Sequence, residues 1–264
     1  KVPMYLDVSV FMSQLEDPTK STVAGKIGYA PMPSGPAGSF PNGGSWAVGI
    51  NSASENKEAA FLFLAWVTSK DMQLQIASDS GLTSRQSVLD APVLAEKFPA
   101  DWLAAFKTDM AATLPEMNFP PVTQIDEFMD IYGGAVNAVI LGQSDAQSAL
   151  DEAAVKVDEL LATEPSAEAT QPPAEVAEGV DWQAYAGTTL HLLMNKHAYT
   201  DSIAKFLPEF TELTGIEVVI DSYSQDEFMN KRLVDFSSGA GTYDFTMMDQ
   251  ATPQYARAGW IEDL

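Results

Sequence analysis

Hydrophobic positions in the second part of the chain follow two different periods. Apolar stretches rich in leucine and β-branched residues predict strands at 186–194, 216–221 and 243–248. Apolar residues at helical spacing predict helices at 201–214, 226–239 and 253–258. Gly215 is expected to stop the first of these helices. Because strands and helices alternate, this part predicts half of an open α/β lobe, with a parallel sheet and right-handed crossovers.

The first part of the chain has strand patterns followed by a long helical region. Strands are predicted at 4–11, 25–33 and 44–50, joined by loops rich in Gly, Pro and Ser. Helical spacing predicts helices at 56–70, 71–78, 102–112, 125–141 and 146–161. Ser54 is expected to cap the first of these helices. The helical ending of this part is typical of the end of a fold, whereas the strand that opens the second part is typical of the beginning of a fold.

Between the two parts, TEPSAEATQPPAEVAEG (163–179) has the composition of a linker. It has no basic side chain, no apolar residue larger than Val176 and two adjacent prolines. Such a segment buries too little apolar surface to offset the entropy of ordering it. The expected organisation is a first part, an acidic Pro/Ala-rich linker and a βαβ part, at 1–162, 163–180 and 181–264. Lys1 is not a translation start, so we expect a processed, cut or permuted sequence.

Composition narrows the class of protein. With 46% hydrophobic residues the chain has enough apolar material for a substantial core, and its longest apolar stretch, 59–67, is too short to span a membrane. The formal net charge of −23 disfavours nucleic acid as a partner. There is no cysteine, which excludes thiol catalysis and disulfides and suits an oxidising, extracytoplasmic space.

Candidate catalytic motifs have simpler structural explanations. Ser54 and Lys57 have the S-x-x-K spacing, but its partner motifs are missing and Ser54 suits a helix cap. His191 lies inside a predicted strand, so a histidine-based triad with His191 or His197 is not expected. The acidic residues between 221 and 227 lack the glycine and ligand spacing of a calcium loop. We therefore expect no enzyme activity, no cofactor and no metal.

Binding chemistry is expected where the strands end. Ligands of an open parallel sheet bind at the carboxyl ends of its strands. The polar and aromatic residues that follow the predicted strands of the second part are His197, Tyr199, Tyr223, Gln225, Asp249 and Gln250. Aromatic faces and hydrogen-bonding side chains together suit a neutral sugar. The alternative, that these are ordinary loop residues, stays open.

Both parts resemble the extracellular solute-binding proteins of ABC importers, the broad family that includes maltose-binding protein. In the second part, the runs similar to the amino-terminal lobe of that family are AGTTLHLLM, PEFTELTGIEVVID, KRLVDFSSGAGTYDFTMMDQ and YARAGWIEDL. In the first part, the runs similar to its carboxy-terminal third are AGKIGYAPMPSGPAG, GGSWAVGINSASENKEAAFLFLAWVTSKDMQ, GLTSRQSVL and LGQSDAQSALDEA. The order is reversed relative to the family, and the family's central stretch has no counterpart.

The resemblance implies incomplete α/β lobes of the type II periplasmic-binding-protein (Venus flytrap) kind, in permuted or tandem order. A fragment spanning two tandem binding proteins, a circular permutant without its middle and an assembly artefact are the alternatives. The resemblance also implies that the loops DVSVF, GGSW and GLTSRQ face a cleft, which adds the candidate ligand residues Asp7, Ser9, Gly44, Trp46 and Arg85. Trp46 could instead be a core residue.

The expected function is extracytoplasmic binding of a sugar or sugar alcohol, by cleft closure without chemistry. The expected partners are the carbohydrate or polyol ligand and the permease subunits of an ABC transporter. The linker resembles the spacer that follows the lipid-anchored cysteine of surface lipoproteins, so lipid anchorage of the parent protein is possible. One alternative is a secreted α/β hydrolase or glycoside-processing domain, in which two carboxylates would flank a cleft. A structural or adhesive surface module is the other.

Overall fold

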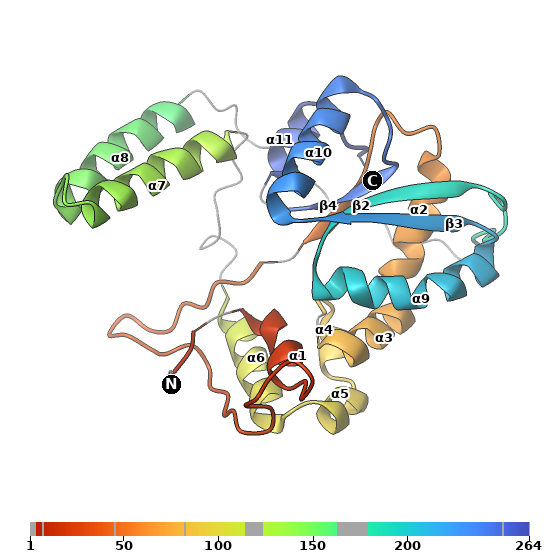
Figure 1. Ribbon diagram of the computed structural model, residues 1–264, viewed down its shortest axis with the longest axis horizontal. Helices are drawn as coiled ribbons and strands as arrows, with labels where there is room; N and C mark the ends of the chain where they lie inside the picture. Colours follow the sequence, from red (N-terminus) through yellow and green to blue (C-terminus); the bar gives the residue numbers. More distant parts are fainter. Residues whose placement is uncertain are drawn as a thin grey trace.

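A mixed sheet with helices on both sides forms the centre of the protein (Figure 1). The computed structural model describes residues 4–6, 8–44, 46–81, 83–113, 124–162, 179–249 and 251–263. The strands are β1 (Ala47–Ile50), β2 (Thr189–Asn195), β3 (Glu217–Tyr223) and β4 (Phe245–Met248). The helices are α1 (Met12–Leu15), preceded by the 3-10 helix η1 (Ser9–Phe11), α2 (Lys57–Val67), α3 (Lys70–Ser80), α4 (Gln86–Leu89), α5 (Pro92–Lys97), α6 (Ala100–Ala112), α7 (Ile125–Ile140), α8 (Ala146–Leu161), α9 (Ala198–Thr214), α10 (Gln225–Ser238) and α11 (Thr252–Arg257).

The sheet brings the two parts of the chain together. Its strand order is β1-β4-β2-β3; β2 is parallel to β3 and β4, as the alternating pattern predicts. Strand β1, from the first part, pairs antiparallel with β4, with Ala47 opposite Met248 and Ile50 opposite Phe245. The predicted strand at 44–50 is therefore confirmed in its second half. An antiparallel partner on a parallel sheet makes the whole sheet mixed.

Two of the three strands predicted in the first part are wrong. The described residues of 4–11 form no strand, and their second half forms η1. Residues 25–33 form no strand either, because their backbone is bonded to side chains of α6. The amide of Tyr29 donates to Asp101 at 2.9 Å, and the amide of Met32 donates to Asp109 at 3.0 Å. These carboxylates take the place of a neighbouring strand.

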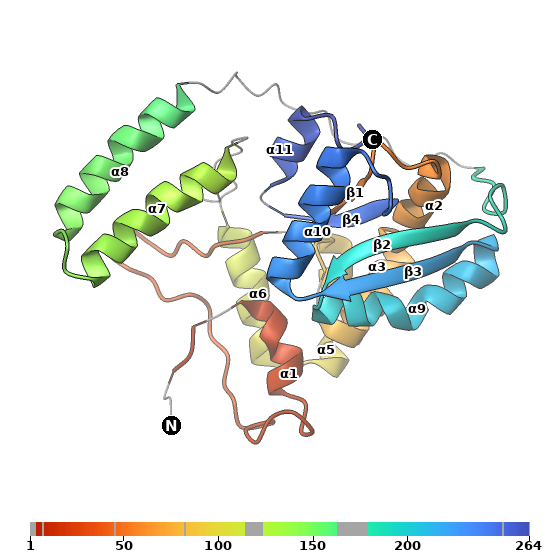
Figure 2. The same cartoon turned by 45° about the horizontal axis from the view of Figure 1, so that its top comes forward.

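One hydrophobic core is built from both parts of the chain. Phe63 of α2 lies with its ring centroid 4.9 Å from that of Phe245 in β4 and 5.3 Å from that of Phe210 in α9. All three residues are fully buried. Helix α9 ends at Gly215, whose φ of 71° is left-handed, so the predicted helix stop is confirmed. In Figures 1 and 2, α9 and α3 lie on one side of the strands and α10 and α11 on the other.

A buried polar network fixes the same junction. Asn51, which follows β1, donates to the carboxylate of Asp235 at 3.0 Å. The carboxylate of Asp244 accepts from Ser54 at 2.6 Å, from Asn56 at 3.1 Å and from the amide of His191 at 2.8 Å. The Ser54 hydroxyl also accepts from the amide of Asn56, which is the N-cap residue of α2. Ser54 therefore lies two residues ahead of the cap position predicted for it.

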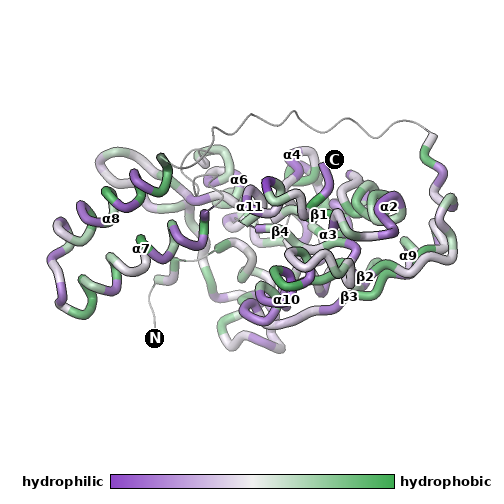
Figure 3. The backbone as a smooth tube through the Cα atoms, turned by 90° about the horizontal axis from the view of Figure 1, so that it is seen from above, coloured by the Kyte–Doolittle hydropathy of each residue, from purple (hydrophilic) through white to green (hydrophobic). Residues whose placement is uncertain are grey.

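The remaining helices lie outside the sheet. Helices α3, α4, α5 and α6 share a second core with α1, in which Trp102 and Leu94 are buried. Helices α7 and α8 form a hairpin that extends from the sheet (Figure 2), and both match their predicted ranges within a residue. Figure 3 shows hydrophobic and hydrophilic turns alternating along this hairpin, as amphipathic helices require. The predicted linker falls mainly on residues outside those described.

Candidate ligand-binding site

Four strands place residues at one edge of the sheet. Strands β2, β3 and β4 run parallel and have their carboxyl ends at Asn195, Tyr223 and Met248. Asn195 and Tyr223 are register partners. Because β1 runs antiparallel and begins opposite Met248, Trp46 precedes β1 at this same edge. The edge is where parallel sheets bind ligands.

Trp46 and His197 form the contact that joins the two parts of the chain at this edge. Their ring centroids lie 4.3 Å apart, and the rings are nearly perpendicular at 86°. Trp46 is 48% exposed, so the indole offers apolar surface to solvent beside the imidazole. Trp46 is therefore not a core residue. The structure brings together two of the residues predicted to bind ligand.

His197 is held in place as the N-cap of α9. Its extended backbone ends the connection from β2, and its Nδ1 accepts a hydrogen bond from the amide of Tyr199 at 3.2 Å. Burial lowers the pKa of the imidazole, while the negative charge of Asp201 acts weakly in the opposite direction. Its buried Nε2 has no partner among the described residues. A neutral imidazole with one unused nitrogen therefore lies beside Trp46.

Asn195 is a candidate that the sequence did not indicate. It is 8% exposed at the last position of β2, and its Nδ2 donates to Oε1 of Gln225 at 2.8 Å. Its backbone carbonyl accepts from the Thr200 hydroxyl at 2.9 Å, which fixes the start of α9. Its side-chain Oδ1 has no partner within the described part of the chain. The sequence signal that could have indicated Asn195 is a single amide side chain at the end of an apolar strand.

Tyr199, in the first turn of α9, and Tyr223, the last residue of β3, lie near the same edge of the sheet. The Tyr199 hydroxyl accepts from Nε2 of Gln73 at 3.3 Å, and its burial raises the pKa of the phenol. The Lys231 ammonium lies 4.5 Å from the centre of the Tyr223 ring. Both tyrosines also pack against the main core. The Tyr199 hydroxyl is therefore engaged by Gln73, and both rings belong to the packing of the fold.

Asp249 has a structural partner. Its carboxylate accepts from Nη2 of Arg232 at 3.0 and 3.2 Å and from the amide of Ala251 at 3.1 Å. The Arg232 and Asp249 side chains are 1% and 6% exposed. Arg232 also donates to the carbonyl of Met247 at 2.9 Å and lies over the rings of Phe228 and Tyr255. The carboxylate is thus occupied by an internal ion pair.

The other predicted residues are not gathered at this edge in the same way. Ser9 begins η1, which directly precedes α1. Arg85 precedes α4 and donates to the carbonyl of Thr68, at the end of α2, at 2.8 Å. A Cβ on Gly44 would meet nothing within 4 Å, so no close approach there requires glycine. Asp7 and Gln250 lie outside the described residues.

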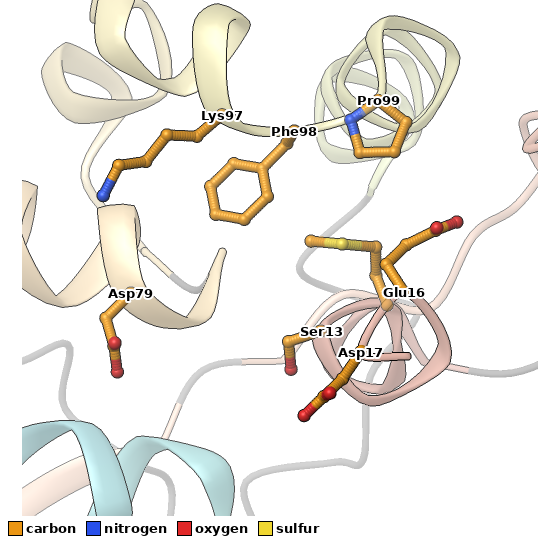
Figure 4. A pocket seen from close by; sticks show the side chains of 8 residues that line it. Ser13, Glu16, Asp17, Asp79, Lys97, Phe98 and Pro99 are labelled. Atoms are coloured by element: carbon orange, nitrogen blue, oxygen red, sulfur yellow. The ribbon is translucent and has the colours of Figure 1, made fainter. Parts of the chain in front are cut away.

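A hollow of about 370 Å³ lies elsewhere, between α1, the end of α3 and the α5–α6 turn (Figure 4). Its charged lining is already engaged in the fold. Asp79 is paired with Lys205 of α9 at 2.6 Å, and Glu16 accepts from the Tyr29 hydroxyl at 2.8 Å. Asp17 accepts from the Thr19 hydroxyl at 2.6 Å. This hollow is an open seam between helices. None of the residues that line it lies at the carboxyl ends of β2, β3 and β4.

Comparison with known proteins gives partial matches. Residues 1–74 match the family described as "Bacterial extracellular solute-binding protein". Part of the chain is therefore similar to bacterial extracellular solute-binding proteins. It is 38% identical over 91 residues to the "Erythritol/L-threitol-binding protein" of Mycolicibacterium smegmatis, covering 34% of this chain and 19% of that protein. The mixed α/β sheet with its helices is consistent with the solute-binding protein fold.

A second relative covers more of this chain. It is the "Probable amino-acid ABC transporter periplasmic-binding protein" of Sinorhizobium fredii, 30% identical over 149 residues, which cover 56% of this chain and 32% of the relative. The chain therefore spans about a third or less of the length of these two relatives. Both relatives are named as binding proteins. No solved structure gave a significant match.

Two features that the described residues lack bear on the site and its setting. No group of three or more His, Asp and Glu side chains there is arranged to hold a metal ion. None of the helices in that part of the chain has the length and apolar character needed to cross a membrane.

Proposed function

We propose that this chain forms a ligand-holding lobe of an extracytoplasmic solute-binding protein that delivers a sugar or sugar alcohol to an ABC transporter. The proposal rests on one observation: exposed Trp46 lies against His197, which follows the buried Asn195 by two residues at the carboxyl end of β2. An aromatic ring covers the C–H surface of a sugar, and amide and imidazole groups bond its hydroxyls. The four-carbon polyol in the name of the Mycolicibacterium relative supports this ligand class.

The mechanism is capture without chemistry. The lobe holds one side of the solute, and a second lobe of the whole protein closes over the other side. Because the ligand contacts both lobes only in the closed form, binding shifts the population toward that form. The permease subunits of the transporter then recognise the closed form and receive the solute unchanged. Lipid anchorage would keep the protein at the membrane surface.

The glycoside-processing alternative is less well supported. Such enzymes place two carboxyl groups about 5–10 Å apart across the scissile bond. The carboxylate that follows β4, Asp249, is bonded to buried Arg232 and to a backbone amide. A general acid or nucleophile at this position would first have to leave its ion pair. Binding needs no such rearrangement.

The proposal is tested by titrating the 264-residue chain with erythritol, L-threitol and common sugars. The readouts are tryptophan fluorescence and amide shifts in ¹⁵N–¹H spectra, which detect weak binding to one lobe. We expect a saturable response that Trp46→Phe removes from the fluorescence and that the control Trp260→Phe keeps. Mass spectrometry should recover the ligand unchanged. Turnover of nitrophenyl glycosides or esters, or no saturable response to any polyol or sugar, would contradict the proposal.

A further inference from the structure

The end of β2 carries an unpaired acceptor inside the fold. Asn195 is more than nine-tenths buried, and its Nδ2 is bonded to Gln225 at 2.8 Å. With Nδ2 engaged in this bond, Oδ1 is the acceptor left without a partner among the residues described. Buried amide oxygens are nearly always bonded in folded proteins, and an unpaired one points to an absent partner. That partner has to be a hydrogen-bond donor.

Two residues further along, His197 carries an unpaired donor. Nδ1 of His197 accepts the amide N–H of Tyr199, and an accepting nitrogen carries no proton. The neutral ring therefore has its proton on Nε2, which is buried without a partner in the described structure. Burial favours this neutral form by lowering the pKa. The partner of Nε2 has to be a hydrogen-bond acceptor.

We propose that Asn195 and His197 make this site select an uncharged, hydroxyl-bearing ligand and reject a carboxylate. The proposal rests on the function proposed above and specifies its ligand class. A hydroxyl group both donates, as Oδ1 of Asn195 requires, and accepts, as Nε2 of His197 requires. A carboxylate only accepts and would meet the Asn195 oxygen with a lone pair against a lone pair. The Trp46 ring beside His197 suits the C–H surface of a polyol.

The charges near the edge agree with this selection. Arg232 is paired with Asp249 and buried, and Lys231 lies over the Tyr223 ring. Lys196, between the two selecting residues, is exposed, so water screens its charge. The chain as a whole carries a net charge of −23, which repels anions. A carboxylate would therefore lose its hydration without gaining a buried cation.

A matched pair of ligands tests the selection directly. Erythritol and erythronate share a four-carbon skeleton and differ by one carboxylate, and both are titrated against the 264-residue chain by ¹⁵N–¹H shift changes. We expect erythritol to bind at least tenfold more tightly than erythronate. Equal or tighter binding of erythronate at the β2 edge overturns the selection but leaves the proposed function standing. Failure of every polyol and sugar overturns the proposed function, and with it the selection.

Two variants separate ligand recognition from helix capping. His197→Asn keeps a good N-cap side chain and removes the Nε2 donor. The control His191→Asn alters the exposed histidine inside β2. We expect only His197→Asn to weaken erythritol binding, at least tenfold, with an unchanged melting temperature in both variants. Unchanged erythritol binding in His197→Asn would overturn the proposal.

The tautomer provides a test that needs no ligand. Long-range ¹H–¹⁵N spectra of the imidazole rings, assigned with His191→Asn, report which nitrogen carries the proton. We expect His197 at pH 7.5 to be neutral with its proton on Nε2. A proton on Nδ1, or a charged ring, overturns the selection even if polyols bind, because the donor would then be misplaced.

Discussion

The rings of Trp46 and His197 meet edge to face, with centroids 4.3 Å apart, although the residues come from opposite parts of the chain. Trp46 immediately precedes β1, and His197 caps α9. Their contact exists because β1 pairs with β4 and so begins at the carboxyl edge of the other strands. The candidate site is therefore a product of the fold of both parts, and neither part contains it alone.

Replacing Trp46 by Ala should affect ligand binding far more than folding. The indole is 48% exposed, so the loss in free energy of unfolding should be about 1 kcal/mol or less. Urea denaturation followed by circular dichroism measures this loss, and erythritol titration by amide shifts measures the binding. Phe63→Ala, in the core, is the comparison and should cost about 3–5 kcal/mol. A loss of that size in Trp46→Ala would make Trp46 a scaffold residue.

Asp244→Asn should strongly destabilise the junction between β1 and the rest of the sheet. The buried carboxylate accepts from Ser54, Asn56 and the amide of His191, and an amide nitrogen cannot accept any of these bonds. We expect a loss of about 2–4 kcal/mol in the free energy of unfolding, measured by urea denaturation. Asp130→Asn, on the exposed face of α7, is the matched control and should change stability by about 0.5 kcal/mol or less. Similar losses in both variants would show that the buried network does not stabilise the junction.

The sequence predicted local structure well and long-range structure poorly. The apolar period of 125–141 gave α7 nearly residue for residue, because an amphipathic helix is encoded within itself. The strand prediction for 25–33 was wrong because the partners of its backbone amides, Asp101 and Asp109, lie on a helix far along the chain. Strand positions depend on such distant partners, and alternation alone does not identify them.

For the candidate site too, the sequence predicted the local features and missed the long-range contacts. The strand-end rule predicted that His197 follows a strand, and it does follow β2, since the end of a strand is a local feature; its role in ligand binding stays a prediction. Its contact with Trp46 depends on the β1–β4 pairing, which no local pattern encodes. Asp249 was expected at the site as a ligand residue, but its ion pair with Arg232 could not be read from spacing. Asn195 was missed because an amide at a strand end also suits an ordinary turn.

The two parts of the chain should fold as one unit. Strand β1 pairs with β4, and Phe63 packs between Phe210 and Phe245, so separation would expose the core of both. Fragments 1–170 and 171–264 should each lack a cooperative thermal transition alone and should regain one when mixed in equal amounts. The intact chain is the reference, and calorimetry makes the measurement. Two independent transitions in the separate fragments would instead establish two domains.

Stability should depend on pH through His197. Burial holds its folded-state pKa below the unfolded value of about 6.5, so the unfolded chain binds more protons as pH falls. The stabilisation is complete above the unfolded pKa, is lost as pH falls through it, and levels off below the folded pKa. Urea denaturation between pH 7.5 and 5.5 should therefore show a decline that His197→Asn reduces. His191→Asn should keep the decline, and an equal reduction in both variants would exclude His197 as its source.

The buried pair of Arg232 and Asp249 should be costly to break and cheap to replace as a whole. Arg232→Met leaves the Asp249 carboxylate buried without its cation, which should lower the free energy of unfolding by about 3–5 kcal/mol. Arg232→Met with Asp249→Leu removes both charges and should recover much of that loss, because well-packed apolar side chains of similar volume often replace a buried pair without penalty. Urea denaturation of both single variants and the double variant gives the coupling energy. If the two single losses simply add in the double variant, the pair does not hold the end of β4 and Asp249 becomes available again as a ligand-binding residue.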